Sequence, residues 1–400
     1  MNTSRIQFCP RAMLMALIFF FGTHGLAVAQ QRQLQYGVGK QFGKVPLMTQ
    51  SRARASAATA NLPQRRDVRY TVKQIGVLPG YESSYLPINH TINNNGVVAG
   101  YSYNGAFAVW PDFALTATAF IGKPDKLKAL PKLNGWPGAF AAGLNDNNQV
   151  FGYANKLDEL GQFKQTPVLW DHGIIKELPT LPGSIYTEID EINNRGDMVG
   201  YFYLPGDVPF PIMWHDGKVK QLPLPAGAVN GWSQAINDWG EIIGTAVFPN
   251  GVDMGGNQVF DFHLYAWMPW GDDPVGVDLG SNFWGAFGQV WDVNNLSQMV
   301  GSAVNTAIEY RGFIWNWGSM KEIGLPGSIW SEMWSINNWG QVLGIGDRAD
   351  GQAVCILAQH SDVSDLNTLV PADTPLLTTP SGINDWGVIA TVSFTEDGRT

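Results

Sequence analysis

A pentapeptide that recurs along the chain constrains its fold more than any other sequence feature. INDWG occurs at 236–240 and again at 383–387, and INNWG occurs at 336–340. Alignment on this motif gives seven copies of a nine-residue phrase, which start at residues 92, 144, 192, 236, 293, 336 and 383. A repeat of about 48 residues is typical of repeat arrays and propellers, in which each copy is one supersecondary unit.

The phrase itself has the chemistry of a tight turn between two strands. An apolar residue and Asn end one strand, a short loop usually ends in Gly, and an apolar run follows. Asn and Asp bond the backbone two residues ahead, and Gly accepts a positive φ at little cost. Asn148 and Ser297 replace the Gly in two copies. The repeated residues are therefore assigned a structural role, and none of them is assigned to a site.

Each copy continues with two further strand signals. A short strand that usually ends in Trp comes first, and a polar turn and a strand ending in Leu follow. The Trp strands end at Trp110 (GAFAVW, 105–110), Trp170, Trp214, Trp267 and Trp315. Four antiparallel strands per repeat predict an all-β fold, a seven-bladed β-propeller of four-stranded antiparallel blades spanning 70–400.

The two ends of the repeat region suggest how the ring closes. The seventh copy lacks its last strand, and the segment YTVKQIGVLPG that starts at Tyr70 looks like such a strand without a predecessor. Pairing the two would complete the seventh blade and hide two sheet edges. We therefore expect closure by an N-terminal strand.

The segment before Tyr70 has a different composition. Residues 1–29 combine two arginines, an apolar run and an A-x-A pattern, which predicts a secretory signal peptide. Residues 30–69 are rich in Gln, Ala, Ser and Arg, which predicts a disordered basic leader. We therefore expect an exported protein, extracellular or periplasmic, with no membrane span. Cys355 is predicted to be a buried apolar residue.

The charge of the repeat region limits its partners. Residues 70–400 carry 15 Lys and Arg against 33 Asp and Glu. An acidic surface repels phosphate backbones, so nucleic acid is excluded as the expected partner.

The repeat pattern also resembles a known family. INxxGxVVG followed by an H-A-F-x-W strand and a strand ending in Leu is similar to the HAF-repeat family of bacterial extracellular repeat proteins. HLYAW at 263–267 and RGFIW at 311–315 are the nearest matches to the naming motif. The resemblance covers roughly residues 70–400 and implies an extracellular location and a repeat architecture, but no catalytic residues.

The segments between repeats are the candidate binding surface. They are variable and aromatic, and loops on a rigid scaffold often carry function. The candidate ligand-binding residues are Tyr81, Tyr85, Trp136, Tyr186, Trp232, Trp284, Trp330 and Trp334. Rings edged by acids and amides suit sugars, which stack on aromatic faces and hydrogen bond through their hydroxyl groups. The pattern favours a secreted binding module for carbohydrate or a cell-surface polymer, although the same rings are also suited to packing between blades.

Two alternatives remain open. Glu188 and Glu332 lie in the similar phrases LPGSIYTEID and LPGSIWSEMW, and a carboxylate pair could serve a glycan hydrolase or lyase. A scaffold that binds other envelope proteins is the second alternative. No cofactor is predicted, although Asp253 with Asp261, or the pair Asp272–Asp273, offers oxygen ligands for a structural calcium ion.

Overall fold

The computed structural model describes residues 70–393, except 89, 105–111, 125, 207, 253–257, 269–274, 281–287, 306, 308 and 317. The predicted signal peptide and basic leader lie outside these residues. No helix in the described part of the chain is long and apolar enough to cross a membrane.

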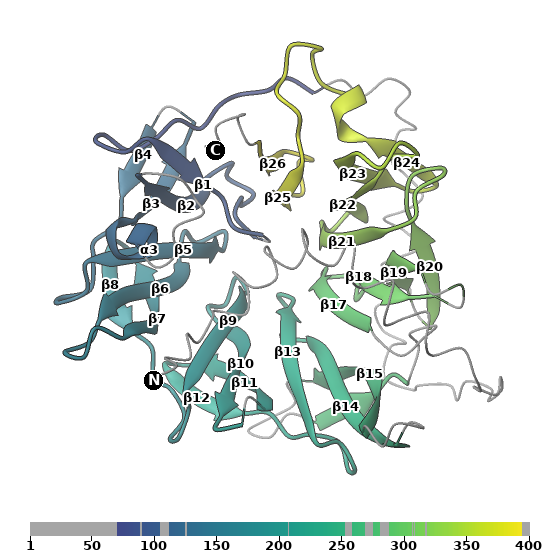
Figure 1. Ribbon diagram of the computed structural model, residues 1–400, viewed down its shortest axis with the longest axis horizontal. Helices are drawn as coiled ribbons and strands as arrows, with labels where there is room; N and C mark the ends of the chain where they lie inside the picture. The colour runs from purple at the N-terminus through teal and green to yellow at the C-terminus, as the bar shows by residue number, and fades with distance from the viewer. Residues whose placement is uncertain are drawn as a thin grey trace, which may run out of the picture. The chain divides into compact units, whose positions relative to one another are not determined.

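Antiparallel sheets surround a central axis, with the first strand of each sheet innermost (Figure 1). Six sheets have four strands each. Blade 1 contains β1 (Ser83–Tyr85), β2 (Val98–Tyr103), β3 (Thr118–Lys123) and β4 (Lys126–Ala129), with the short helix α3 (Asp112–Thr116) before β3. Blade 2 contains β5 (Gly138–Leu144), β6 (Val150–Leu157), β7 (Phe163–Asp171) and β8 (Ile174–Glu177). Blade 3 contains β9 (Tyr186–Ile192), β10 (Met198–Leu204), β11 (Val208–His215) and β12 (Lys218–Gln221).

The remaining blades follow the same order. Blade 4 contains β13 (Asn230–Ile236), β14 (Ile242–Val252), β15 (Gln258–Met268) and β16 (Val275–Asp278). Blade 5 contains β17 (Gly288–Val293), β18 (Met299–Val304), β19 (Tyr310–Asn316) and β20 (Ser319–Ile323). Blade 6 contains β21 (Ser331–Ile336), β22 (Gln341–Asp347), β23 (Ala353–Gln359) and β24 (Asp362–Asp365), followed by the 3-10 helix η2 (Leu366–Thr368). A two-stranded sheet, β25 (Thr379–Ile383) and β26 (Ile389–Val392), comes last.

The prediction of seven four-stranded blades is wrong, because the described chain forms a six-bladed β-propeller. The seventh repeat contributes only the two-stranded sheet β25–β26. The segment that starts at Tyr70 does not form the predicted closing strand. Its Gly76 has a φ of 79°, which is incompatible with a continuous strand. Tyr70 instead donates one backbone hydrogen bond to Leu369, at 2.7 Å.

The two-stranded sheet nevertheless connects the end of the ring to its beginning. β25 packs against β21 and β22 of blade 6. On its other side, the Ser381 hydroxyl donates to the Leu86 carbonyl at 3.0 Å, and the Thr91 hydroxyl donates to the Ser381 carbonyl at 2.7 Å. The sheet therefore lies between blade 6 and blade 1 (Figure 1).

The predicted turn chemistry is confirmed. Gly240 has a φ of 80°, and the two residues that replace Gly, Asn148 and Ser297, have φ values of 60° and 58°. All three lie in the left-handed region that ends the three-residue loop. The turn signal could be recognised in the sequence because every interaction that defines it is local.

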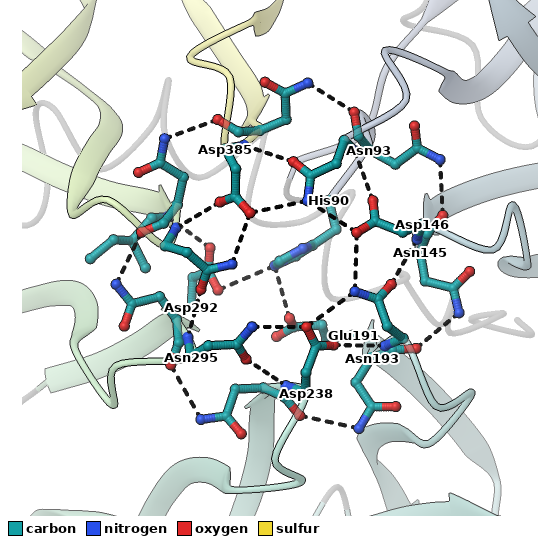
Figure 2. A pocket seen from close by; sticks show the side chains of 18 of the residues that line it. His90, Asn93, Asn145, Asp146, Glu191, Asn193, Asp238, Asp292, Asn295 and Asp385 are labelled. Atoms are coloured by element: carbon teal, nitrogen blue, oxygen red, sulfur yellow. Dashed lines mark hydrogen bonds and ion pairs between the residues drawn. The ribbon is translucent and has the colours of Figure 1, made fainter. Parts of the chain in front are cut away.

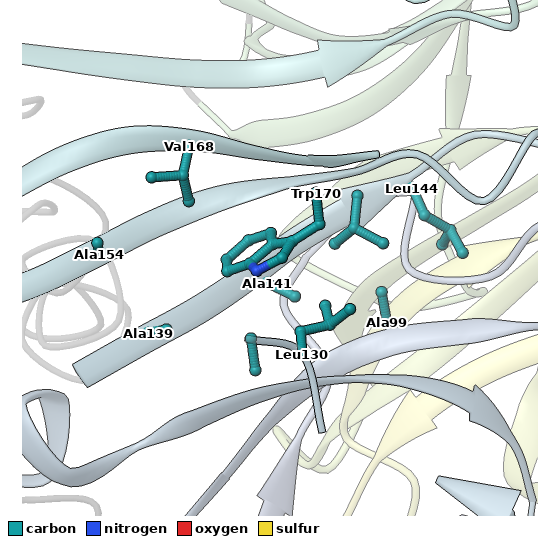
Figure 3. Packing of buried hydrophobic residues seen from close by; sticks show 10 residues of the cluster. Ala99, Leu130, Ala139, Ala141, Leu144, Ala154, Val168 and Trp170 are labelled. Carbon is teal, nitrogen blue, oxygen red and sulfur yellow. The ribbon is translucent and has the colours of Figure 1, made fainter. Parts of the chain in front are cut away.

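The core consists of clusters between neighbouring sheets. The third strands of blades 2 to 5 each contain a tryptophan one residue before the strand end, close to the predicted place, and these residues are at most 3% exposed: Trp170, Trp214, Trp267 and Trp315. Between blades 1 and 2, alanines leave room for the Trp170 ring (Figure 3). The indole N–H of Trp170 donates to the Pro131 carbonyl at 2.7 Å, which ties the blade to the segment entering it. Cys355 is fully buried, as predicted.

Blade 1 departs from the predicted strand assignment. Its third strand was predicted at 105–110, ending at Trp110, whereas the structure places it at Thr118–Lys123 after α3. Residues 105–110 lie outside the described part of the chain. The strand found in this position, TAFIGK, contains a run of three apolar residues, and its first three residues are buried.

Candidate functional site

Seven turns, one from each sheet, meet at one end of the central axis (Figure 2). Each turn joins the first and second strands of its sheet and begins with an asparagine, which we call the turn asparagine. The seven turn asparagines are 3–5% exposed. They are Asn93, Asn145, Asn193, Asn237, Asn294, Asn337 and Asn384.

A closed ring of hydrogen bonds joins the turn asparagines. The side-chain amide of each one donates to the backbone carbonyl of the next, over 2.9–3.2 Å. The bond from Asn384 to Asn93 closes the ring between the last sheet and blade 1. Each side-chain oxygen also accepts two backbone N–H groups of its own turn, as Asn237 does from Trp239 and Glu241. Each turn asparagine therefore stabilises both its own turn and the contact with its neighbour.

The residues that follow the turn asparagines form a second ring. The backbone N–H of each donates to the side-chain Oδ1 of the next, over 2.8–2.9 Å. These residues are Asn94, Asp146, Asn194, Asp238, Asn295, Asn338 and Asp385. The amide of Asn194 bridges the carboxylates of Asp146 and Asp238, at 3.1 Å from each. The aspartates are thus held in place by neutral amides.

A histidine and two acids lie inside these rings. His90 Nε2 lies 3.0 Å from Glu191 Oε1 and 3.3 Å from Asp292 Oδ1 (Figure 2). The residues come from blades 1, 3 and 5, and the side chains of Glu191 and Asp292 are 4% and 1% exposed. Neither His90 Nε2 nor Asp292 Oδ1 has an aligned hydrogen bond within the described residues. The three atoms are therefore close together without forming a regular hydrogen-bonded triad.

The second oxygen of each acid is bonded in the same way. Glu191 Oε2 accepts the backbone N–H of Ile236 at 2.9 Å, and Asp292 Oδ2 accepts that of Ile336 at 2.8 Å. Each carboxylate is thus held by the next blade, with its other oxygen facing His90. A hydrogen bond that fixes one oxygen orients the other, as outer partners do for metal ligands.

Burial and charge act in opposite directions on these groups. Burial disfavours the imidazolium form of His90, but the carboxylates of Glu191 and Asp292 outweigh it and raise the pKa of His90 to about 10. Burial also raises the pKa of Glu191 well above its usual value, although His90 opposes this shift. The charges of His90 and Glu191 therefore depend on each other.

The surrounding pocket is strongly acidic. Among the described residues, its lining includes five carboxylates but no Lys or Arg, and His90 is the one basic side chain. The carboxylates belong to Asp146, Glu191, Asp238, Asp292 and Asp385. The cavity volume is about 110 Å³, whereas a water molecule needs about 10–15 Å³ by the same measure. The pocket therefore has room for a cation with some of its water shell, and its charge attracts one.

The sequence assignment missed these three residues. It treated the repeated phrase as a turn, which is confirmed, but the turns also form the wall of the pocket. A signal was available in the alignment of the copies. The residue two before the turn asparagine is acidic in two copies, Glu191 and Asp292, and Thr, Gly, Ala or Ser in the others.

The aromatic candidates are divided between the core and a partly exposed set. Tyr85 and Trp334 are 3% and 2% exposed, so their rings pack inside the protein. Trp284 lies outside the described residues. The half-buried candidates are Tyr81, Trp136, Tyr186, Trp232 and Trp330.

Two of the half-buried rings occupy equivalent places in different blades, and a third lies two residues further along its repeat. Tyr186 and Trp330 lie seven residues before their turn asparagines, and Trp232 lies five before its own. Because these places are at or near the starts of first strands, the three residues lie toward the strand ends opposite the turns.

Several of the half-buried rings already contact neighbouring side chains. Lys156 Nζ lies 4.3 Å from the centre of the Trp136 ring, which also packs against the cluster between blades 1 and 2. The Tyr81 hydroxyl lies 2.5 Å from the Thr118 hydroxyl. Trp232 contacts Phe262 edge-on, with ring centres 6.4 Å apart.

The candidate catalytic carboxylates are both buried. Glu188 is 1% exposed and accepts a hydrogen bond from the Tyr186 hydroxyl. Glu332 is 8% exposed and accepts one from the Trp334 indole at 2.9 Å. Neither lines the axial pocket. Burial raises the pKa of Glu332 to about 7, although the Trp334 hydrogen bond opposes this shift.

The raised pKa of Glu332 predicts a pH-dependent stability. The folded state binds this proton up to about pH 7, whereas the unfolded chain loses it near 4.5. Stability is therefore lost as the pH rises between these values, by about 3 kcal/mol in total. Glu332→Gln keeps an acceptor for Trp334 and is expected to equal the parent at pH 4.5 and exceed it at pH 8. Urea unfolding at pH values across this range measures the free energy of unfolding of each variant, and Glu159→Gln, at an exposed position, is the control. If the free energies of the parent and of Glu332→Gln changed with pH in parallel, the raised pKa of Glu332 would be refuted.

The calcium candidates are mostly outside the described residues. Asp253, Asp272 and Asp273 belong to gaps in the description, and only Asp261, in β15, is placed.

Comparisons with known proteins bear on the fold alone. No family model and no curated protein matches the chain. Among solved structures, it is similar to TolB from Acinetobacter baumannii, with 14% identity, a TM-score of 0.40 and coverage of 67% of this chain and 65% of TolB. An acylaminoacyl peptidase from Pyrococcus horikoshii gives 12% identity and a TM-score of 0.47, over 72% of this chain and 46% of the peptidase. An ulvan lyase, a polysaccharide lyase, gives 9% identity and a TM-score of 0.41, over 80% of this chain and 90% of the lyase. All three TM-scores are below 0.5, and the fold is therefore defined by the sheet order of the structure itself.

Proposed function

We propose that the chain is a non-catalytic binding module that holds a carbohydrate or cell-surface polymer at the axial end opposite the turn asparagines. The supporting observation is the partial exposure of Tyr186 and Trp232 in mostly buried first strands, and of Trp330 immediately before another. In β13, for example, the neighbours Gly231 and Ser233 are buried while Trp232 is half-buried. A ring that keeps exposed surface here can stack on the C–H face of a sugar.

The polar groups near these rings fit the same class of ligand. Glu188 lies two residues after Tyr186, and Glu332 two residues after Trp330, so carboxylates accompany both rings. Sugar hydroxyl groups pair with carboxylates and amides, which orient a ring stacked on an aromatic face. Glu188 is buried and accepts a hydrogen bond from Tyr186, whereas the buried Glu332 accepts one from Trp334, so Glu188 holds its rim ring directly.

Export supports this proposal from a different direction. Residues 1–29 have the pattern of a signal peptide, and the repeat pattern resembles the extracellular HAF-repeat family. An exported protein encounters glycans and envelope polymers, so we assign the protein to the periplasm or cell exterior as part of the same proposal.

Substitution of the rings tests the binding surface. Polysaccharides retained by the purified protein are first identified in a pull-down panel, and their affinities are then measured calorimetrically. Trp232→Ala and Trp330→Ala are each expected to weaken binding about tenfold, since a stacked ring contributes about 1.4 kcal/mol. Trp386→Ala, at a ring 78% exposed in a turn at the opposite end, is the matched control and is expected to bind normally. Unchanged affinity in both rim variants would exclude this surface.

A second function has one specific observation in its favour. A buried carboxyl group with a pKa of about 7, as in Glu332, is suited to general acid catalysis. An extracellular glycan hydrolase or lyase would release new chain ends from a bound polysaccharide, and Glu332→Gln would abolish this release without abolishing binding.

A further inference from the structure

The cluster of His90, Glu191 and Asp292 is not used by the proposed binding surface. Its three donor atoms lie within 4.8 Å of one another, inside the pocket formed by the turns. Asp292 is 1% exposed, and its Oδ1 points to this centre, where His90 Nε2 lies 3.3 Å away without an aligned hydrogen bond to it among the described residues (Figure 2). A buried carboxylate oxygen without a hydrogen bond is costly unless a cation or another donor satisfies it.

The two distances from His90 to the carboxylate oxygens match those between neighbouring ligands of a metal ion. Bonds of about 2.1 Å place neighbouring ligands about 3.0–3.4 Å apart in octahedral or tetrahedral geometry. His90 Nε2 lies 3.0 Å from Glu191 Oε1 and 3.3 Å from Asp292 Oδ1. The opposite carboxylate oxygens accept backbone N–H groups of Ile236 and Ile336, so both ligating oxygens are already oriented.

The donor set indicates which ions fit. One imidazole nitrogen and two carboxylate oxygens suit first-row transition ions, whereas calcium and magnesium prefer oxygen ligands alone. The excess of carboxylates in the pocket lining adds a field that favours any divalent cation. The imidazole therefore favours transition-metal ions over calcium and magnesium, and the acidic lining attracts divalent cations in general.

We propose that His90, Glu191 and Asp292 form a binding site for a divalent transition-metal ion, with Zn²⁺ as the best-fitting probe. The ion completes its coordination with water from the pocket. Because each ligand comes from a different blade, the ion links blades 1, 3 and 5 across the axis. Because such an ion binds only the folded ring, it stabilises the propeller against unfolding.

Calorimetric titration of the chelator-treated protein with Zn²⁺ tests the site. One ion is expected to bind per chain, with much weaker binding of Mg²⁺ and Ca²⁺. Asp292→Asn removes a ligand and is expected to weaken Zn²⁺ binding at least about a hundredfold, since loss of outer partners alone costs 10–100-fold. Asp385→Asn removes a carboxylate from the same lining but not from the cluster, and is expected to weaken binding far less.

Two further measurements keep the result interpretable. His90→Gln retains an N–H group opposite the carboxylates, so it provides the test if Asp292→Asn does not fold. Substitution with Co²⁺ gives a visible absorption spectrum that reports bound imidazole, and His90→Gln is expected to change it. Zn²⁺ binding that survives both variants would place the ion elsewhere, for example near the exposed His215 and its buried partner Asp197. No binding to the parent protein would leave the cluster as an ion-paired clamp and overturn the proposal.

Discussion

Replacement of Asn237 by alanine is expected to destabilise the propeller by about 4 kcal/mol. The side chain makes four hydrogen bonds: it accepts from the Trp239 and Glu241 backbones, and it donates to the Asn294 carbonyl and the Glu241 carboxylate. Each contributes about 1 kcal/mol net, and more where a buried partner is left unsatisfied. Glu241 is 5% exposed, so water cannot readily replace the lost bonds.

The same substitution at an exposed turn position is the control. Asn147 lies at the tip of the blade 2 turn and makes an exposed side-chain bond to the Asn194 carbonyl. Asn147→Ala is expected to cost less than about 1 kcal/mol. Denaturant unfolding measures both variants, and equal costs at the two positions would show that the ring of turn asparagines does not hold the sheets together.

Replacement of Trp267 by alanine is expected to cost about 3–5 kcal/mol. The ring is fully buried between blades 3 and 4, beside Tyr265 at 4.8 Å between ring centres. Truncation leaves a large cavity and also removes the indole hydrogen bond to the Pro223 carbonyl, at 2.7 Å. Trp267→Phe fills most of that space and is expected to lose mainly the hydrogen bond, about 1 kcal/mol.

Trp239 supplies the matched control for this change. It is 61% exposed at a turn, so Trp239→Ala removes the same side chain without opening a cavity. Its expected cost is below about 1 kcal/mol. If Trp267→Ala and Trp239→Ala had similar thermal midpoints, the Trp-ended strands would not be the interblade anchors described here.

The parts of the fold that depend on local chemistry could be predicted from the sequence. The turn residues Asn237 and Gly240 form one loop, and their hydrogen bonds and φ values follow from residue type. The Trp-ended strands likewise show in the alternation of apolar residues. These features need no knowledge of which sheets are neighbours.

The number of blades could not be predicted in the same way. Seven turn signals are present, but a blade needs four paired strands, and pairing depends on partners far apart in the chain. Gly76 interrupts the segment starting at Tyr70, and this segment meets Leu369 through one backbone bond instead of a ladder. Counting turns therefore overestimated the number of complete blades.

The site could not be predicted either, because its residues are far apart in the sequence and only the fold brings them together. His90 and Asp292 are about 200 residues apart in the sequence, and only the ring brings them to 3.3 Å. A register shift just before the turn, such as that between Val290 and Asp292, changes which side chains face the axis. For the aromatic rim, packing between sheets decided that Trp334 is buried while Trp330 keeps exposed surface.

The central claim is that the propeller binds a polymer without cleaving it, and one measurement tests both halves of it. The purified protein is incubated with a panel of polysaccharides, and retention and newly formed chain ends are measured in the same samples. We predict retention of at least one polysaccharide with no new chain ends above the protein-free control. New chain ends that disappear in Glu332→Gln would contradict the claim in favour of an enzyme, and no retention of any polysaccharide would contradict the binding proposal itself.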